Sequence, residues 1–202
     1  MLLNYPCPAG WLAPLVPAGT ELDTWQGETL VSLVGFLFAD TRLLGVSIPG
    51  HRTFEEVNLR FYVRRPGPDG HPRRAVVFIR ELVPRRAIAW TARWTYNEPY
   101  LAVPMWHALD LDRERGGTAA YGWTHQGTAF ALTAAADGPA RPLVPDSEAE
   151  FITEHYWGYT RSATAARSST RWRIRPGSCG PPTRRCSAAR RPRSTAPASA
   201  AC

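Results

Sequence analysis

The clearest alternation of apolar and polar side chains lies in residues 51–64, HRTFEEVNLRFYVR. Because successive side chains of a β-strand point to opposite faces, this pattern predicts a strand with one apolar and one polar face. The apolar face carries Val57, Leu59, Phe61 and Val63, and the polar face carries Glu56, Asn58, Arg60, Tyr62 and Arg64. Two interpretations of the polar face remain open. It is either an outer face with weak ion pairs in solvent, or the lining of a wet internal cavity.

The segments around this strand predict further strands joined by turns. The run TLVSLVGFLF at 29–38 suits a strand buried on both faces. A PGPDG turn at 66–70 precedes a second alternating run, which indicates a hairpin. The predicted strands besides 51–64 are 29–38, 43–48, 75–82, 118–125 and 128–134.

Short helices complete the predicted elements. A helical turn is expected at 12–16, a helix at 84–96, and another at 148–155 behind the capping box formed by Ser147 and Glu150. The acidic residues at 110–114 predict a solvated turn, because Arg115 stands where a calcium loop needs glycine. We therefore expect an α+β domain, mainly antiparallel β, built on a curled sheet or barrel with two or three short helices.

The charge of the chain is divided unevenly along its length. The whole chain has a net charge of +7, yet residues 1–160 contain 14 arginines and all 17 acidic residues. The remaining 10 arginines lie at 161–202, without one acidic residue. A nucleic-acid-binding domain is therefore not expected, because the basic character belongs to the C-terminal segment alone. No apolar run is long enough to span a bilayer and no secretory signal is present, so we expect a cytoplasmic protein.

Residues 162–202 consist almost entirely of Ala, Arg, Ser, Pro and Thr. One interpretation is a disordered tail. We favour another, an out-of-frame translation of GC-rich DNA. With permitted codons, reading that starts on the last base of the Arg161 codon gives QRDGRTLEYAVAHPPW. This string contains a turn and an alternating strand of the kind that the domain needs next. We therefore predict a partial domain at 1–161 and a disordered tail at 162–202.

Known metal and cofactor motifs are absent from the sequence. The five histidines and four cysteines show no zinc or redox spacing, and no glycine-rich phosphate loop occurs. We expect no metal and no cofactor. If the polar face of 51–64 lines a cavity, Arg60 would hold a carboxylate by two hydrogen bonds. Glu56 would then act as a general acid or base, with its pKa raised by burial.

Other polar residues near this strand extend the predicted site. Arg80 is a second candidate anchor for an anion, and Glu98 is the alternative proton-transfer group. The predicted ligand-binding residues are Glu56, Asn58, Arg60, Tyr62, Arg80, Asn97 and Tyr100.

Several blocks of the sequence resemble the YqjF-like family of uncharacterised bacterial proteins, domain of unknown function 2071. These blocks are LAPLVPAGTELD, VSLVGFLFADTRLLG, FEEVNLRFYVRR, VVFIRELVPRRAIA, YNEPY and FITEHYWGYTR, and the resemblance covers residues 2–161. Members of the family begin one strand earlier and continue with further strands, so the chain is expected to be incomplete at both ends. The family is similar in fold to acetoacetate decarboxylase, an antiparallel β-cone around a central pocket. The resemblance therefore implies that the polar face of 51–64 points inward.

The resemblance does not carry the activity over. Acetoacetate decarboxylase forms a Schiff base on a lysine, and this chain contains no lysine. Two main hypotheses remain, since fold analogy is a weak argument for function, beside the remote alternative of nucleic-acid binding through the basic tail. The first is a protein that binds a small anionic or carbonyl-bearing molecule, with or without catalysis that avoids a Schiff base. The second is a non-catalytic binding or structural domain whose polar strand face is only a satisfied network.

Overall fold

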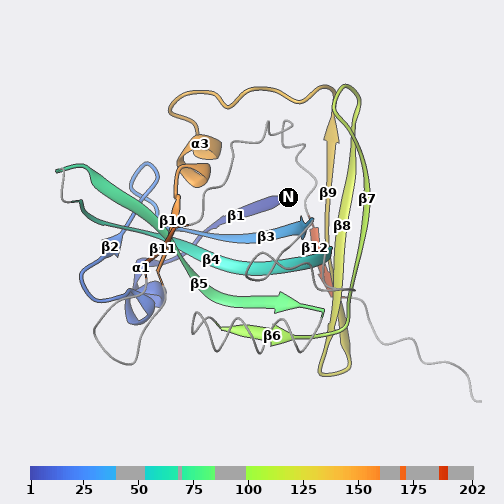
Figure 1. Cartoon of the computed structure of the whole chain (residues 1–202), viewed down its shortest axis with the longest axis horizontal. Helices are drawn as coiled ribbons and strands as arrows, with labels where there is room; N and C mark the ends of the chain where they lie inside the picture. Colours follow the sequence, from blue (N-terminus) through green and yellow to red (C-terminus); the bar gives the residue numbers. More distant parts are fainter. Residues whose placement is uncertain (40–52, 68–69, 85–98, 160–168, 172–186, 191–202) are drawn as a thin grey trace, which may run out of the picture.

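The computed structural model describes residues 1–39, 53–67, 70–84 and 99–159, and the backbone of 169–171 and 187–190 (Figure 1). The strand predicted at 43–48 lies outside these residues, as does the helix predicted at 84–96 apart from its first residue. Two short strands of the described backbone, β11 and β12, fall within the segment that the sequence predicts to be a tail.

The main sheet is built around two long antiparallel strands, β4 (Phe54–Pro66) and β5 (Pro72–Val83). Its strand order is β1 (Leu2–Pro6), β3 (Leu30–Phe38), β4, β5, β10 (Trp157–Tyr159) and β11 (Ser169–Arg171). The two-residue β2 (Glu21–Leu22) pairs with β4, and β6 (Tyr100–Ala102) runs parallel to β5. The strands predicted at 29–38, 51–64 and 75–82 are confirmed.

The two faces of β4 are both covered from Phe54 to Val63, so this part of its polar face is not a solvated outer face. On one face Phe61 and Val63 pack with Leu12, at the end of α1 (Ala9–Leu12) and before η1 (Ala13–Leu15). On the other face Tyr62 packs with Phe151 of α3 (Glu148–Thr153). The side chains from Phe54 to Val63 are therefore buried apart from the half-buried Leu59, including the polar ones.

A β-bulge changes the phase of the β4–β5 hairpin. Asn58 pairs with Glu81 and Leu59 with Arg80, but Arg60 pairs with Phe78, so that Ile79 is the extra residue. An extra residue on one strand shifts the side-chain alternation by one position. This shift places Glu81 on the same face as Asn58, and Arg80 on the opposite face.

The capping box predicted before α3 is present in altered form. The backbone N–H of Glu150 donates to Ser147 Oγ at 3.2 Å, as expected of an N-cap serine. The Glu150 carboxylate accepts from the backbone of Asp146 at 2.7 Å, one residue before the expected partner. The helix is fixed over the sheet, because Phe151 and Ile152 are buried against it.

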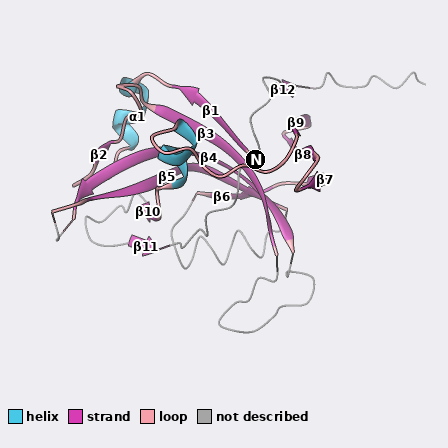
Figure 2. Ribbon diagram, turned by 90° about the horizontal axis from the view of Figure 1, so that it is seen from above, coloured by secondary structure: helices cyan, strands magenta, loops and turns pink. Residues whose placement is uncertain are grey.

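A second antiparallel sheet lies across one end of the first (Figures 1 and 2). Its order is β12 (Ser187–Arg190), β9 (Thr128–Asp137), β8 (Gly116–His125) and β7 (Met105–Asp112). The hairpin predicted at 118–134 is confirmed. The strand β7 was not predicted from the sequence, and its last residues carry part of the expected acidic turn. In that turn the Asp112 carboxylate accepts hydrogen bonds from the backbone N–H groups of Glu114 and Arg115, each at 2.9 Å.

The contact between the sheets depends on a glycine. A Cβ at Gly35 of β3 would lie 2.7 Å from the ring of Tyr121 in β8, so only glycine admits the ring at this position. Beside it, His107 Nδ1 lies 3.2 Å from Glu55 Oε2. Burial, reinforced by the Glu55 charge, raises the pKa of Tyr121.

These elements confirm a mainly antiparallel fold with a few short helices. The described strands form two open sheets rather than one closed sheet. Within the described ranges, no helix has the length and apolar character needed to cross a membrane.

Candidate functional site

Four polar side chains of the described residues meet on one face of β4, which Tyr100 of β6 reaches across the intervening β5. We call Glu56, Asn58, Arg60 and Tyr100 the Glu56 cluster. The three β4 residues share one face because they alternate along the strand. Their exposed fractions are 2% for Glu56, 2% for Asn58 and 8% for Arg60, and Tyr100 is half-buried. The structure thus shows that Glu56, Asn58 and Arg60 are buried rather than exposed to solvent.

Glu56 is held by neutral hydrogen-bond donors. Asn58 Nδ2 donates to one carboxylate oxygen at 3.0 Å, and the Tyr100 hydroxyl donates to the other at 3.2 Å. Burial raises the pKa of Glu56 to about 7, against the opposing effects of these two hydrogen bonds and of the Arg60 charge. The carboxyl group is thus close to half protonated at neutral pH, which suits an acid–base role.

Two buried polar atoms of the Glu56 cluster lack a hydrogen-bond partner among the described residues. They are the amide oxygen Oδ1 of Asn58 and the Nε–H of Arg60. The Arg60 guanidinium lies 5.8 Å from the ring centre of Tyr62, which provides a cation–π contact but no acceptor for Nε. Buried polar groups in folded proteins are nearly always paired, so these two atoms are exceptions among the described residues.

Tyr62 lies on the same face but belongs to a different set of contacts. Its hydroxyl lies 2.5 Å from Ser32 Oγ, and Ser32 donates its own proton to Asn4 Oδ1 at 2.6 Å. Tyr62 is therefore the donor to Ser32. Asn4 in turn donates to Glu148 at the start of α3, at 2.8 Å. The structure assigns the Tyr62 hydroxyl to a chain that joins β4, β3, β1 and α3.

A second buried polar group, the Asp23 cluster, lies beside Tyr62 and consists of Asp23, Arg74 and His155. Arg74 Nε donates to Asp23 Oδ2 at 2.8 Å, and His155 Nε2 lies 3.0 Å from the same oxygen. The other His155 nitrogen lies 2.7 Å from the carbonyl of Phe151, and the Tyr62 ring packs 4.6 Å from the imidazole. The three residues thus fasten the end of α3 to the sheet.

Burial and hydrogen bonding have opposing effects on the pKa values in the Asp23 cluster. Burial opposes ionisation of Asp23, yet hydrogen bonds from His155 and Arg74 hold its pKa below the ordinary value. Burial lowers the pKa of His155, against the hydrogen bond to Asp23 that raises it. The sequence analysis missed this cluster because its members lie far apart in the chain, and Asp23 follows a strand of only two residues.

The remaining predicted site residues are distributed differently. Arg80 is exposed and lies on the opposite face of β5 from the Glu56 cluster, because of the bulge at Ile79. Glu81, 2% exposed, takes the position beside Asn58 that uninterrupted alternation assigns to Arg80. Asn97 and Glu98 lie outside the described residues.

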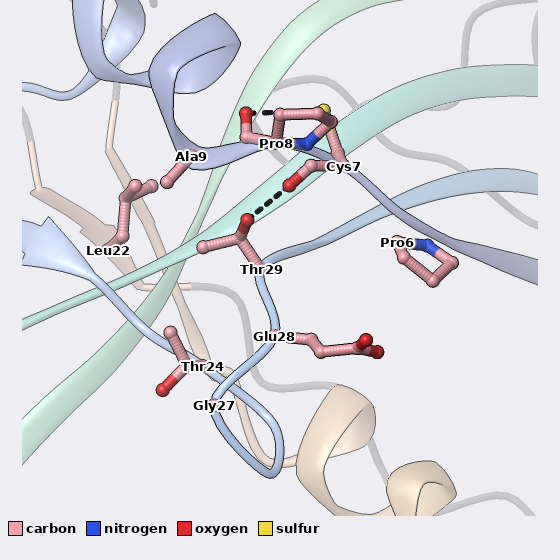
Figure 3. Close-up of a pocket in the computed structure, with 9 residues that line it drawn as sticks. All are labelled: Pro6, Cys7, Pro8, Ala9, Leu22, Thr24, Gly27, Glu28 and Thr29. Carbon is pink, nitrogen blue, oxygen red and sulfur yellow. Dashed lines mark hydrogen bonds between the residues drawn. The ribbon is translucent and has the colours of Figure 1, made fainter.

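A surface cavity of about 460 Å³ lies elsewhere (Figure 3). Its lining comes from the end of β1, the start of α1, β2 and the turn before β3: Pro6, Cys7, Pro8, Ala9, Leu22, Thr24, Gly27, Glu28 and Thr29. Thr29 donates a hydrogen bond to the Cys7 carbonyl across it. Along β3, Thr29 lies three residues before Ser32, the partner of Arg60, and seven before Phe36, the partner of Glu56. These separations correspond to about 10 Å and about 23 Å.

Metal-binding side chains are not grouped in the described part of the chain. No three His, Cys, Asp or Glu residues there approach one another closely enough to hold an ion. The Glu56 cluster offers one carboxyl group, one amide and one guanidinium from β4, and a phenol from β6.

Solved structures with the same arrangement of strands identify the class of fold. The chain superposes on acetoacetate decarboxylase from Legionella pneumophila with a TM-score of 0.51 and 16% identity, over 77% of this chain and 52% of that one. An acetoacetate decarboxylase-like enzyme from Sphingomonas wittichii RW1 gives a TM-score of 0.53 and 12% identity, over 84% and 66% of the two chains. The fold is therefore acetoacetate decarboxylase-like, as the resemblance implies.

Sequence comparison places the chain within a family of that fold class. The model of the DUF2071 family, described as an uncharacterized conserved protein, matches residues 1–176, and the chain belongs to this family. The uncharacterized protein YqjF of Bacillus subtilis (strain 168) is 30% identical over 120 residues, which are 59% of this chain and 45% of that protein. The chain thus spans less than half the length of this relative, and about half to two thirds of the matched structures.

Proposed function

We propose that this protein binds a small molecule bearing a carboxylate or a carbonyl group against the Glu56 cluster. The observation that carries the proposal is the pair of buried, unpartnered polar atoms on Asn58 and Arg60. A lost hydrogen bond to a buried donor or acceptor costs about 1–3 kcal/mol. A ligand that pairs with these atoms recovers that free energy.

Arg60 is the anchor of the proposed site. Its guanidinium offers planar donors that match a carboxylate or carbonyl oxygen. Glu56 takes its hydrogen bonds from Asn58 and Tyr100, which leaves the Nε–H of Arg60 available to an incoming acceptor. Similarity to an acetoacetate decarboxylase, an enzyme named for a small keto acid, agrees with ligands of this size.

Glu56 is the proton-transfer group of the proposed site. A carboxyl group with a pKa of about 7 both gives and accepts a proton near neutral pH. For a bound keto acid, the Glu56 carboxylate would take a proton from the carbon beside the carbonyl and return one from solvent. In heavy water this exchange replaces the methyl protons of pyruvate with deuterium, and proton NMR follows their loss. Loss of exchange in Glu56→Gln is the expected result.

The binding proposal is tested by thermal shift with acetate, pyruvate, acetoacetate and acetone. A ligand that binds only the folded protein raises the midpoint of unfolding with concentration. We expect stabilisation by the acids that disappears in Arg60→Gln. Arg113→Gln is the matched control, because Arg113 is exposed in the turn after β7. No stabilisation by any compound in the wild-type protein contradicts the proposal and favours a purely structural role for the Glu56 cluster.

A further inference from the structure

The two unpartnered atoms of the Glu56 cluster have opposite hydrogen-bonding character. Arg60 Nε carries a hydrogen and only donates, whereas Asn58 Oδ1 has lone pairs and only accepts. Both side chains are more than nine-tenths buried. A ligand that offers only acceptors, as a simple keto acid does, satisfies Arg60 and leaves Asn58 unsatisfied.

The direction of the Asn58 amide follows from its neighbour. Its Nδ2 donates to Glu56 Oε1 at 3.0 Å. Rotating the amide by 180° would bring Oδ1 against the carboxylate oxygen, which is repulsive while Glu56 is ionised. In the structure Nδ2 faces Glu56, and Oδ1 has no partner among the described residues. Since Asn58 and Arg60 are alternate residues of one strand face, their Cα atoms lie about 7 Å apart, within the span of a small ligand.

Resting on the function proposed above, we propose that the preferred ligand is a small hydroxy acid. Its carboxylate accepts a hydrogen bond from Arg60 Nε, and its hydroxyl donates to Asn58 Oδ1. Asn58 thereby becomes the residue that distinguishes a hydroxyl from a carbonyl. A site built to accept a hydrogen bond from a substrate hydroxyl discriminates against the analogue that lacks it, because the buried acceptor is then left unpaired.

Two matched ligand series test this proposal with the wild-type chain. One compares lactate, pyruvate and propionate, and the other compares 3-hydroxybutyrate, acetoacetate and butyrate. Each series holds the carbon skeleton and the carboxylate constant and changes only the oxygen function. In isothermal titration we expect one hydroxy acid to bind about tenfold more tightly than its keto and unsubstituted partners, which corresponds to one hydrogen bond.

A variant then assigns the preference to one residue. Asn58→Leu keeps a similar side-chain size and removes the acceptor. We expect the affinity for the favoured hydroxy acid to fall about tenfold, to that of its unsubstituted partner, which itself changes little. Arg60→Gln should weaken all three members of the series alike. If Asn58→Leu does not fold, the wild-type comparison still decides, since it needs no substitution.

The outcomes separate this inference from the function on which it rests. Equal affinity within both series overturns the hydroxy-acid preference and leaves carboxylate binding standing. A preference that survives in Asn58→Leu overturns the role of Asn58. Absence of binding by all six compounds overturns the proposed function and the inference together.

Discussion

The Asp23 cluster and the Glu56 cluster lie on the same face of the main sheet and differ in how completely they are paired. In the Asp23 cluster the carboxylate receives Arg74 and His155, and the imidazole also contacts a backbone carbonyl. In the Glu56 cluster the carboxylate is hydrogen-bonded only by neutral groups, while Asn58 Oδ1 and Arg60 Nε have no partner among the described residues.

This difference separates a structural role from a binding role. A buried polar network stabilises a fold when each member is paired, and it is costly when only part of it is. The pKa shifts agree with this distinction between the two clusters. Hydrogen bonds and charged partners lower the pKa of Asp23, whereas burial raises the pKa of Glu56. Four predictions test the contrast, in order of decreasing expected effect.

The largest effect is expected from Asp23→Asn. This change removes the charge that pairs with Arg74 and His155 and should lower the free energy of unfolding by about 3 kcal/mol. Urea denaturation measures it as a lower midpoint. Glu21→Gln is the control, since it removes only an exposed ion pair with Arg64 and should cost less than about 1 kcal/mol. Equal losses of stability in Asp23→Asn and Glu21→Gln would contradict a special structural role for the Asp23 cluster.

The Glu56 carboxyl group should make the folded protein less stable as pH rises. A carboxyl group whose pKa is lowered in the folded state, such as Asp23, has the opposite effect. Its folded-state pKa of about 7 lies above the ordinary 4.5, so the folded state holds the extra proton between these values. Stability contributed by this group therefore falls as pH rises from 4.5 to 7, by up to about 3 kcal/mol. Denaturation of Glu56→Gln at several pH values should lack this fall. If the stability of Glu56→Gln depends on pH as that of the wild-type protein does, the pKa of Glu56 is not raised by burial.

The affinity for an anion should also decrease as pH rises. The change in binding free energy should be smaller than the change in the free energy of unfolding. Ionised Glu56 repels a carboxylate beside Arg60, so an acid should bind about tenfold more weakly at pH 8 than at pH 6. The affinity of Glu56→Gln should stay constant over this range. Titration in two buffers of different ionisation enthalpy should reveal proton uptake on binding to the wild-type protein. Binding without proton uptake at pH 7 would place the anion away from Glu56.

The smallest effect is expected from Tyr62→Phe. The substitution removes the hydrogen bond to Ser32 and should cost about 1 kcal/mol of stability. Ligand affinity should remain unchanged, because the structure assigns this hydroxyl to the chain that leads to α3. A tenfold loss of affinity at unchanged stability would instead place Tyr62 in the binding site, as the sequence analysis predicts.

The strands with strong alternation or continuous apolar runs could be predicted because local pattern determines which face of a strand is buried. The same reasoning found the capping serine of α3. It missed β7, whose eight side chains are exposed but for the half-buried Met105 and which pairs with β8 along one edge. Leu109 and Leu111 alternate with Asp110 and Asp112, but the same acidic residues also indicate a solvated turn. The pairing of this edge strand is therefore decided by the neighbouring strand.

The sequence by itself determined that Glu56, Asn58 and Arg60 share one face of a strand, because alternation is a property of the extended backbone. Only the tertiary structure decided that this face is buried, since coverage depends on segments distant in the chain. It also decided which charge of β5 lies beside Asn58. The bulge at Ile79 brings Glu81 to that position and turns Arg80 outward, and a one-residue register shift leaves no mark in the alternation of either strand.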